Sequence, residues 1–248
     1  MAVAYGTVSG SGLFVQTTFA SSLSIASTNF SGTDVLLVAQ VEAFVFGTAA
    51  ISSVQWDVAT PENFTQQYAD ENNNASSFYV YTHAAGSGAT DTVTANFPSS
   101  RDQISLITSS FTGVDQTTPI KDSGTGTHSL GYNTPETFTI TLATAAADEM
   151  IASVTFTDGT GVSYTTGTNQ TQAYDDDAGP SYAWHGRMEY KDGADGNTAT
   201  ISTDNDSNGS TVLHWAALFN DAGGGGGGTT IPLLVNSYRR HHQQHHSG

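Results

Sequence analysis

The chain contains no cysteine and very little positive charge. The missing cysteines exclude disulfide bonds, thiol catalysis and thiolate metal sites. Six basic residues stand against 23 acidic ones, so the formal net charge of the 248-residue chain is −17. Because such an acidic surface repels phosphate groups, we expect no binding to nucleic acid. Charged residues of both signs make up 12% of the chain, about half the usual share.

Long hydrophobic runs are missing as well. No apolar run approaches the roughly 20 residues that cross a bilayer, so the sequence predicts no membrane span. Residues Met1–Thr7 have neither a basic nor an apolar region, and we therefore expect no secretory signal peptide. Little lysine, no cysteine and much serine, threonine and glycine suit an extracellular protein or a virion component released by lysis.

Small hydroxyl residues and aromatic residues, by contrast, are abundant. The 27 serines and 36 threonines form a quarter of the chain, and there are 26 glycines. The 12 Phe, 10 Tyr and 3 Trp residues supply enough apolar surface for a core, which excludes disorder of the whole chain.

Most apolar runs are short, rich in β-branched or aromatic residues, and bounded by Gly, Asn, Asp or Pro, as strands are. Alternation is clear in Thr137–Leu142, where Phe138, Ile140 and Leu142 are predicted to face inward. The candidate strands are Leu13–Phe19, Asp34–Phe46, Ser53–Asp57, Ser77–His83, Thr90–Phe97, Gln103–Thr112, Thr137–Leu142, Met150–Thr157, Val162–Thr166, Ser181–Tyr190, Thr198–Thr203 and Thr211–Phe219. Only Ala143–Glu149 has helical propensity, and no internal repeat of fixed period is visible. The sequence predicts one all-β domain, an antiparallel two-sheet β-sandwich of the jelly-roll type.

A run of six glycines divides the chain into a body and a tail. Residues 1–222 are the predicted sandwich domain, residues 223–228 a flexible linker, and residues 229–248 a tail. The first 228 residues hold all 23 acidic residues and four basic ones, a net charge of −19, whereas the tail is +2. Opposite charges favour docking of the tail on the body of the same or a neighbouring subunit.

The tail carries an apolar stretch followed by basic residues. We predict that it adds to a sheet edge or groove of a neighbouring copy and that its basic end contacts an acidic surface. The residues assigned to this role are Ile231, Leu233, Leu234, Val235, Tyr238, Arg239 and Arg240. The alternative is a frayed chain end with no role in assembly.

Two segments resemble a known class of β-sandwich. Ser110–Ile120 follows a predicted strand and precedes a glycine-rich loop, and the predicted strand Val212–Phe219 closes the body. Together they resemble the jelly-roll, lectin-like sandwich domains of phage structural proteins and secreted bacterial proteins. The resemblance covers residues 5–221 and implies a structural or surface-binding role, with no catalytic residues to carry over.

Residues Asp204–Gly209 match the first half of a calcium-binding loop, in which oxygen ligands at alternate positions converge on a hard cation. The predicted calcium ligands are Asp204, Asp206 and Asn208. Trp215 stands where an acidic ligand is expected, and the alternative is a β-hairpin with an Asn-Gly turn and no metal. Two further acidic segments, Asp175–Asp177 and Asp192–Asp195, would form a cation-binding rim with this loop if all three lie at one end of the sandwich.

Exposed aromatic rings beside polar groups would bind carbohydrate. The residues assigned to such a site are Trp184 and Tyr190, with Tyr68 as a further candidate. Trp56 and Trp215 lie among apolar neighbours and are predicted to belong to the core.

Motifs of known catalytic classes are absent: the chain has no nucleophile elbow, phosphate-binding loop or zinc-protease motif. No spacing pairs two of the glutamates, and the histidines of the body stand isolated in the sequence. These residues are Glu42, Glu62, Glu136 and Glu189, and His83, His128, His185 and His214. We therefore expect no enzymatic activity.

These patterns favour a non-enzymatic structural component of a virion or other extracellular assembly, of the capsid-decoration, fibre or spike type. Its partners would be copies of itself and other particle or filament proteins. The alternative is a lectin-like module that binds surface glycans. Apart from the candidate calcium ion, no cofactor is expected.

Overall fold

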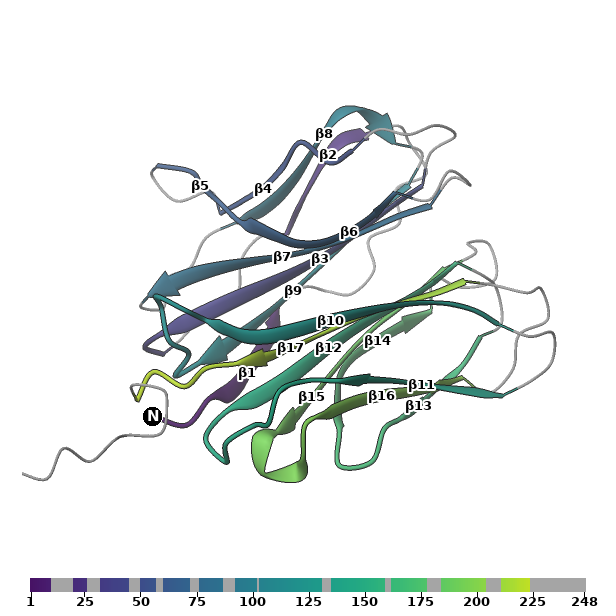
Figure 1. The fold of residues 1–248 in the computed structure, drawn as a ribbon. Coiled ribbons are helices and arrows are strands. Elements are labelled where there is room, and N and C mark those ends of the chain that lie inside the picture. The colour runs from purple at the N-terminus through teal and green to yellow at the C-terminus, as the bar shows by residue number, and fades with distance from the viewer. Residues whose placement is uncertain are drawn as a thin grey trace, which may run out of the picture.

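Figure 1 shows four β-sheets stacked one above another. The computed structural model describes residues 1–9, 20–25, 32–44, 50–56, 60–71, 76–86, 92–101, 103–130, 135–158, 162–177, 184–203 and 211–223. Within these residues the regular secondary structure consists of β-strands and one 3₁₀ turn, η1, at Gly193–Asp195. The strand pairs are antiparallel. The prediction of an all-β antiparallel fold is confirmed.

The first half of the chain, residues 1–112, builds two of the sheets. Its strands are β1 (Ala4–Ser9), β2 (Ala20–Ile25), β3 (Val35–Phe44), β4 (Ser53–Trp56), β5 (Glu62–Asn63), β6 (Thr65–Glu71), β7 (Ser76–Gly86), β8 (Val93–Arg101) and β9 (Gln103–Thr112). The inner sheet of the first half has the order β1-β9-β3-β7-β6, and the outer sheet has the order β2-β8-β4-β5.

The second half, residues 120–219, builds the other two. Its strands are β10 (Ile120–Ser129), β11 (Glu136–Thr141), β12 (Met150–Asp158), β13 (Tyr164–Thr166), β14 (Thr171–Asp177), β15 (Trp184–Asp192), β16 (Thr198–Thr203) and β17 (Thr211–Phe219). The inner sheet of the second half has the order β10-β17-β12-β15-β14, and the outer sheet has the order β11-β16-β13. The sequence predicts two sheets, whereas the described strands form four.

Apolar side chains fill all three spaces between the four sheets. One cluster, with Leu37 of β3 and Trp56 of β4, lies between the two sheets of the first half. A second, with Phe78 and Phe156, joins the two inner sheets, and two smaller clusters lie between the sheets of the second half. Because the inner sheets are covered on both faces, strands such as β3 are buried along consecutive residues and do not alternate between buried and exposed ones.

The second half repeats the strand order of the first. Strands β1, β9, β3, β7 and β6 correspond to β10, β17, β12, β15 and β14, and β2, β8 and β4 correspond to β11, β16 and β13. Irregular pairing recurs at matching places. The register shifts after Tyr5, which faces Phe111, and likewise after Ile120, which faces Phe219. The pairing of β6 with β7 and that of β14 with β15 are also both interrupted by a shift of register.

No fixed period relates the two halves, which is why the sequence does not display the repeat. Leu36 corresponds to Met150, 114 positions further on, because Leu36 faces Phe111 and Met150 faces Phe219, the phenylalanines near the ends of β9 and β17. Phe111 corresponds to Phe219, 108 positions further on. The repeat therefore becomes visible only through strand order and register.

The strands that the sequence did not predict include the polar edge strands β6, β10 and β14. The segments of β6 and β14, for example, read TQQYADE and TQAYDDD and contain no apolar run. An edge strand needs less apolar surface because fewer neighbours cover it. Ala143–Glu149 forms no helix, and the predicted strand Leu13–Phe19 lies outside the described residues.

Candidate functional site

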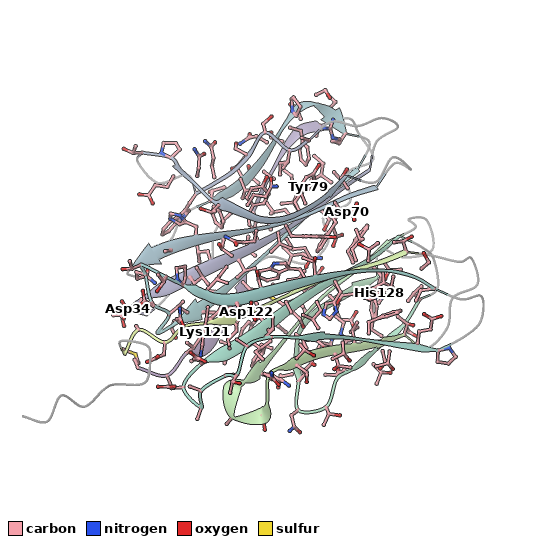
Figure 2. The ribbon with its side chains drawn as sticks, in the orientation of Figure 1. Asp34, Asp70, Tyr79, Lys121, Asp122 and His128 are labelled. Atoms are coloured by element: carbon pink, nitrogen blue, oxygen red, sulfur yellow. The ribbon has the colours of Figure 1, made fainter. Side chains whose placement is uncertain are left out.

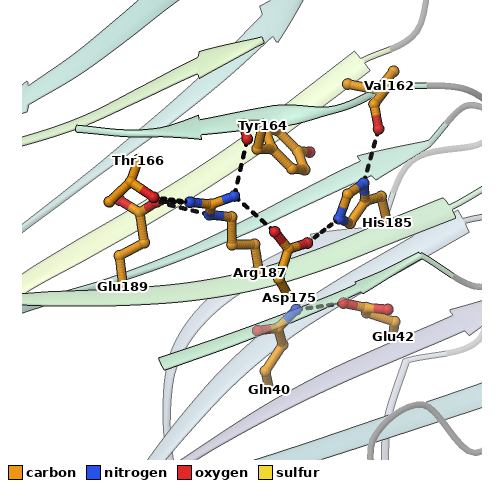
Figure 3. A network of polar contacts seen from close by, with 9 residues as sticks. All are labelled: Gln40, Glu42, Val162, Tyr164, Thr166, Asp175, His185, Arg187 and Glu189. Atoms are coloured by element: carbon orange, nitrogen blue, oxygen red, sulfur yellow. Dashed lines mark hydrogen bonds and ion pairs between the residues drawn. The ribbon is translucent and has the colours of Figure 1, made fainter. Parts of the chain in front are cut away.

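A cluster of charged side chains lies between the two sheets of the second half (Figure 3). His185, Arg187 and Glu189 alternate along β15 and therefore point to the same face of the inner sheet, toward β13. Asp175 reaches the cluster from β14, which pairs with β15 so that Asp175 faces Arg187. We call these four residues the charge cluster.

Arg187 stands at the centre of the charge cluster and is buried, with 2% of its side chain exposed. Its Nε donates to Glu189 Oε1 at 2.7 Å, and one terminal nitrogen donates to Asp175 Oδ2 at 2.7 Å and to the Tyr164 carbonyl at 3.1 Å. The other terminal nitrogen contacts Thr166 Oγ1 and Glu189 Oε1. All five N–H groups of the guanidinium thus have acceptors within the protein, which is what a buried arginine requires.

His185 is held between two acceptors. Its Nδ1 lies 2.9 Å from the Val162 carbonyl oxygen, and its Nε2 contacts Asp175 Oδ1. A neutral imidazole supplies one donor, whereas this arrangement needs a hydrogen on both ring nitrogens or a protonated carboxyl group. The two acceptors around the ring therefore favour an imidazole with a hydrogen on each nitrogen. With both hydrogens in place the charge cluster is electrically neutral.

Glu189 is the second carboxylate of the charge cluster and is as deeply buried as Arg187. Its Oε2 accepts a hydrogen bond from the amide of Gln170, which comes from the turn between β13 and β14. Burial raises the pKa of Glu189, and the charge of Arg187 opposes that rise. The cluster thus connects β13, β14 and β15 across two sheets.

A histidine with a different environment lies on the same face of the inner sheet. His214 of β17 is completely buried, and neither of its ring nitrogens has a hydrogen-bond partner among the described residues. Burial, with a smaller effect of His128, lowers its pKa to about 3. His128 of β10 stacks on Phe138 with ring centroids 4.0 Å apart. His214 is therefore a neutral side chain in the core.

The first half offers an internal comparison for these polar groups. The register of the matching strands gives Ala69, Tyr79, Tyr81 and Leu106 as the counterparts of Asp175, Arg187, Glu189 and His214. Tyr79, Tyr81 and Leu106 belong to the apolar cluster of the first half. At these matching positions the first half has uncharged side chains, so the strand order by itself does not require the charge cluster.

Several of the residues singled out in the sequence lie outside the described residues. These are Asp204, Asp206 and Asn208 of the candidate calcium loop, the tail residues Ile231, Leu233, Leu234, Val235, Tyr238, Arg239 and Arg240, and the side chain of Trp184. Among the described residues, no group of three His, Asp or Glu side chains could hold a metal ion.

The cation-binding rim made of three acidic segments is wrong. Asp177 faces His185 at the start of β15, whereas Asp192 ends that strand and leads into η1. A strand of nine residues is about 30 Å long, so the two acidic segments lie at opposite ends of the sheet.

The aromatic candidates take part in packing. Trp56 and Trp215 are buried, as predicted. Tyr190, assigned to a carbohydrate site, is partly buried, and its ring stacks on Tyr5 with centroids 4.3 Å apart. Tyr68 packs edge to face on Phe78 at 5.7 Å. Each of these rings therefore contributes to the contact between sheets.

The charge cluster was not predicted, although part of its signal is present in the sequence. His185, Arg187 and Glu189 are spaced two apart in a predicted strand, which places them on one face. Arg187 is also one of only four basic residues in the first 228. The missing information was the pairing of β14 with β15, which brings in Asp175.

No family model, curated protein or solved structure matches this chain. In the described part of the chain there is no helix with the length and apolar character needed to cross a membrane.

Proposed function

We propose that the protein is a non-enzymatic structural component of a virion or another extracellular assembly, of the decoration, fibre or spike type. It works through contacts with copies of itself and with other proteins of the particle or filament. Within this proposal each half of the chain is a sandwich of the jelly-roll type.

The observation that carries the proposal is the strand order. In a jelly roll, eight strands are shared between two facing sheets and the first strand lies beside the last. In the first half β1 lies beside β9 in the inner sheet, while β2, β8, β4 and β5 form the outer sheet. Jelly rolls recur in viral capsid proteins and in lectins, so the order favours a structural or surface-binding role by analogy of fold.

The closed geometry of the charge cluster supports the same proposal. The five N–H groups of Arg187 and both ring nitrogens of His185 are engaged by protein acceptors. Such a cluster holds strands together and leaves these donors no substrate to contact. Its role is to fix β13, β14 and β15 relative to one another.

The tail belongs to the proposal as the segment that reaches a neighbouring copy. Its charge of +2 complements the acidic body, and Ile231–Val235 supplies apolar side chains that can enter a neighbour's groove or sheet edge. Light scattering on the full chain and on residues 1–223 tests this. We expect the full chain to form oligomers and the truncated chain to have a lower mass at equal concentration.

Glycan arrays separate this proposal from the lectin-like alternative. A monomeric chain that binds a defined glycan, and loses that binding when Trp184 is replaced by alanine, would establish the alternative. Oligomers that bind no glycan would support the structural role.

A further inference from the structure

Among the described residues, the side chains that point outward from the two outermost faces of the four-layer stack are uncharged. On the outer sheet of the second half, the side chains of β11 and β16 that point away from the core are Thr137, Thr139, Thr141, Thr198, Thr200 and Ser202. On the outer sheet of the first half, the outward residues of β2, β4 and β8 are Ser22, Ser24, Ser53, Gln55, Thr94 and Asn96. We call these the threonine face and the amide face.

Hydrogen bonds between neighbouring strands order the side chains of each face. On the threonine face, Thr137 and Ser202 hydroxyls are 2.9 Å apart, and those of Thr139 and Thr200 are 3.1 Å apart. On the amide face, the Ser24 and Thr94 hydroxyls are 2.9 Å apart. The Asn96 amide also donates to Ser53 and to Gln55, each at 3.2 Å. Both faces are thus regular arrays of uncharged polar groups.

Charged side chains lie elsewhere on the molecule. Figure 2 labels Asp34, just before β3, and Asp70 and Asp122, on the edge strands β6 and β10 of the inner sheets. On the strands of the outer sheets, the charged residues among those described are Glu62, Arg101 and Glu136. Glu62 pairs with His83 of the inner sheet, Arg101 is buried, and Glu136 faces Thr203, whose side chain is buried.

We propose that the threonine face of one copy packs on the amide face of the next, so that copies stack into a column. This rests on the proposed function and names the surface that it uses. Two chains of charge −17 repel each other least where their contact surfaces hold no charge. Hydroxyl and amide groups both donate and accept, so two such arrays can satisfy each other's hydrogen bonds.

Other occupants fit these faces less well. Nucleic acid would need cations, and a glycan would need an aromatic platform, whereas the aromatic residues on these strands, such as Trp56 and Phe138, are buried. An apolar partner would offer no hydrogen bonds to the hydroxyl and amide groups of these faces. Because the two faces lie on opposite sides of the stack (Figure 1), the contact is head to tail and repeats without closing.

Two variants, each carrying two new carboxylates, test the proposal in the full chain. Thr139→Asp with Thr200→Asp charges the threonine face, and Ser24→Asp with Thr94→Asp charges the amide face. Thr144→Asp with Ala147→Asp adds the same charge in the exposed loop between β11 and β12 and serves as the matched control. Circular dichroism and thermal melting verify that each variant is folded.

We expect each face variant to have a lower mass than the parent chain at equal concentration, because the face contact is lost while the tail is unchanged. The loop control should assemble like the parent chain. When the two face variants are mixed, the intact amide face of one meets the intact threonine face of the other, and a 1:1 dimer forms. The proposal is overturned if a folded face variant keeps the mass of the parent chain over the whole concentration range, or if mixing the two face variants leaves the mass unchanged. A parent chain that is itself monomeric contradicts the proposed function as well.

Discussion

Phe111 and Phe219 lie near the ends of the last strands of the two halves, and their rings meet edge to face with centroids 4.8 Å apart. They occupy equivalent positions, and a contact between equivalent positions is what a twofold axis produces. The segments that follow them also pair antiparallel, through Val114 and Asp221. The two halves therefore pack about an approximate twofold axis.

The Phe111–Phe219 contact predicts coupled effects of mutation. Each residue is fully buried, so replacing either by alanine is expected to lower the free energy of unfolding by about 3–5 kcal/mol. Because the rings touch, the double variant should lose less than the sum of the two single losses, by about 0.5–1.5 kcal/mol. Urea denaturation of the four proteins measures this, and strict additivity would argue against a direct contact.

A second pair of equivalent contacts supports the same axis. Phe78 stacks on Phe156 with centroids 5.5 Å apart, and their counterparts are Gly186 and Glu42. A Cβ atom at Gly186 would lie 2.5 Å from Glu42 Oε1. Glycine at this position therefore provides the space that the Glu42 side chain occupies.

We therefore expect Gly186→Ala to destabilise the protein by about 1–3 kcal/mol, because the new methyl group overpacks the contact between the inner sheets. The same substitution should cost much less in a Glu42→Ala background, where the obstructing carboxylate is gone. A double-mutant cycle by chemical denaturation measures the difference. An equal loss of unfolding free energy in the two backgrounds would show that the new methyl group does not clash with the Glu42 carboxylate.

The charge cluster predicts opposite outcomes for breaking it and for replacing it. Arg187→Ala leaves Glu189 buried without its cation, and a loss of about 3–5 kcal/mol in unfolding free energy is expected. Replacing all four residues of the charge cluster with their first-half counterparts should lower the free energy of unfolding only slightly or even raise it. That variant carries Asp175→Ala, His185→Ser, Arg187→Tyr and Glu189→Tyr. A fourfold variant less stable than Arg187→Ala would show that the second half cannot accept the apolar solution of the first.

His214 predicts a specific loss of stability in acid. Its pKa is about 3 in the folded protein and about 6.5 in the unfolded chain, so only the unfolded state takes up this proton between pH 6.5 and pH 3. Stability should therefore fall with decreasing pH in that window, by at most about 1.4 kcal/mol per pH unit from this residue. In His214→Leu, which copies Leu106 of the first half, the slope of stability against pH should be smaller by one proton. Identical slopes would contradict the burial of a neutral imidazole.

The two acceptors around His185 predict a hydrogen on each ring nitrogen, which NMR can observe. Nitrogen-15 and proton NMR at pH 7 should show two ring N–H protons of His185. The Nδ1–H is hydrogen-bonded to a carbonyl oxygen, and the second proton is shared with Asp175 Oδ1. In Asp175→Ala the second signal should disappear while the Nδ1–H signal persists. A wild-type spectrum with one ring proton and an unprotonated Asp175 would show that the imidazole is neutral.

The sequence was sufficient to predict the strands of the interior and insufficient for their arrangement. The runs Gln103–Thr112 and Thr211–Phe219 combine β-branched, aromatic and small side chains, and they were predicted with the bounds that the structure shows. Both faces of these strands are covered, so nearly all of their residues are buried. The edge strand β10 alternates between exposed and partly exposed residues and leaves no apolar signal. Its existence depends on pairing with β17, which is a tertiary contact.

The repeat and the charge cluster both depend on strand register, which the sequence pattern does not give. Tyr79 and Tyr81 of the first half correspond to Arg187 and Glu189 of the second, so the positions that form the cluster are also positions at which the two halves differ in residue type. Asp175 joins the cluster only through the register of β14 on β15, which depends on a shift that no local pattern indicates. The alternation of side chains within one strand can be read from neighbouring residues, whereas the register between two strands depends on residues far apart in the sequence.

Self-association of the full chain is the measurement that tests the account most directly. Sedimentation velocity over a hundredfold range of concentration, at physiological salt, determines the mass of the species present. The account predicts that the mass rises with concentration above the 25.9 kDa of one chain, with further species at higher concentration as copies stack. A single 25.9 kDa species throughout that range would contradict it.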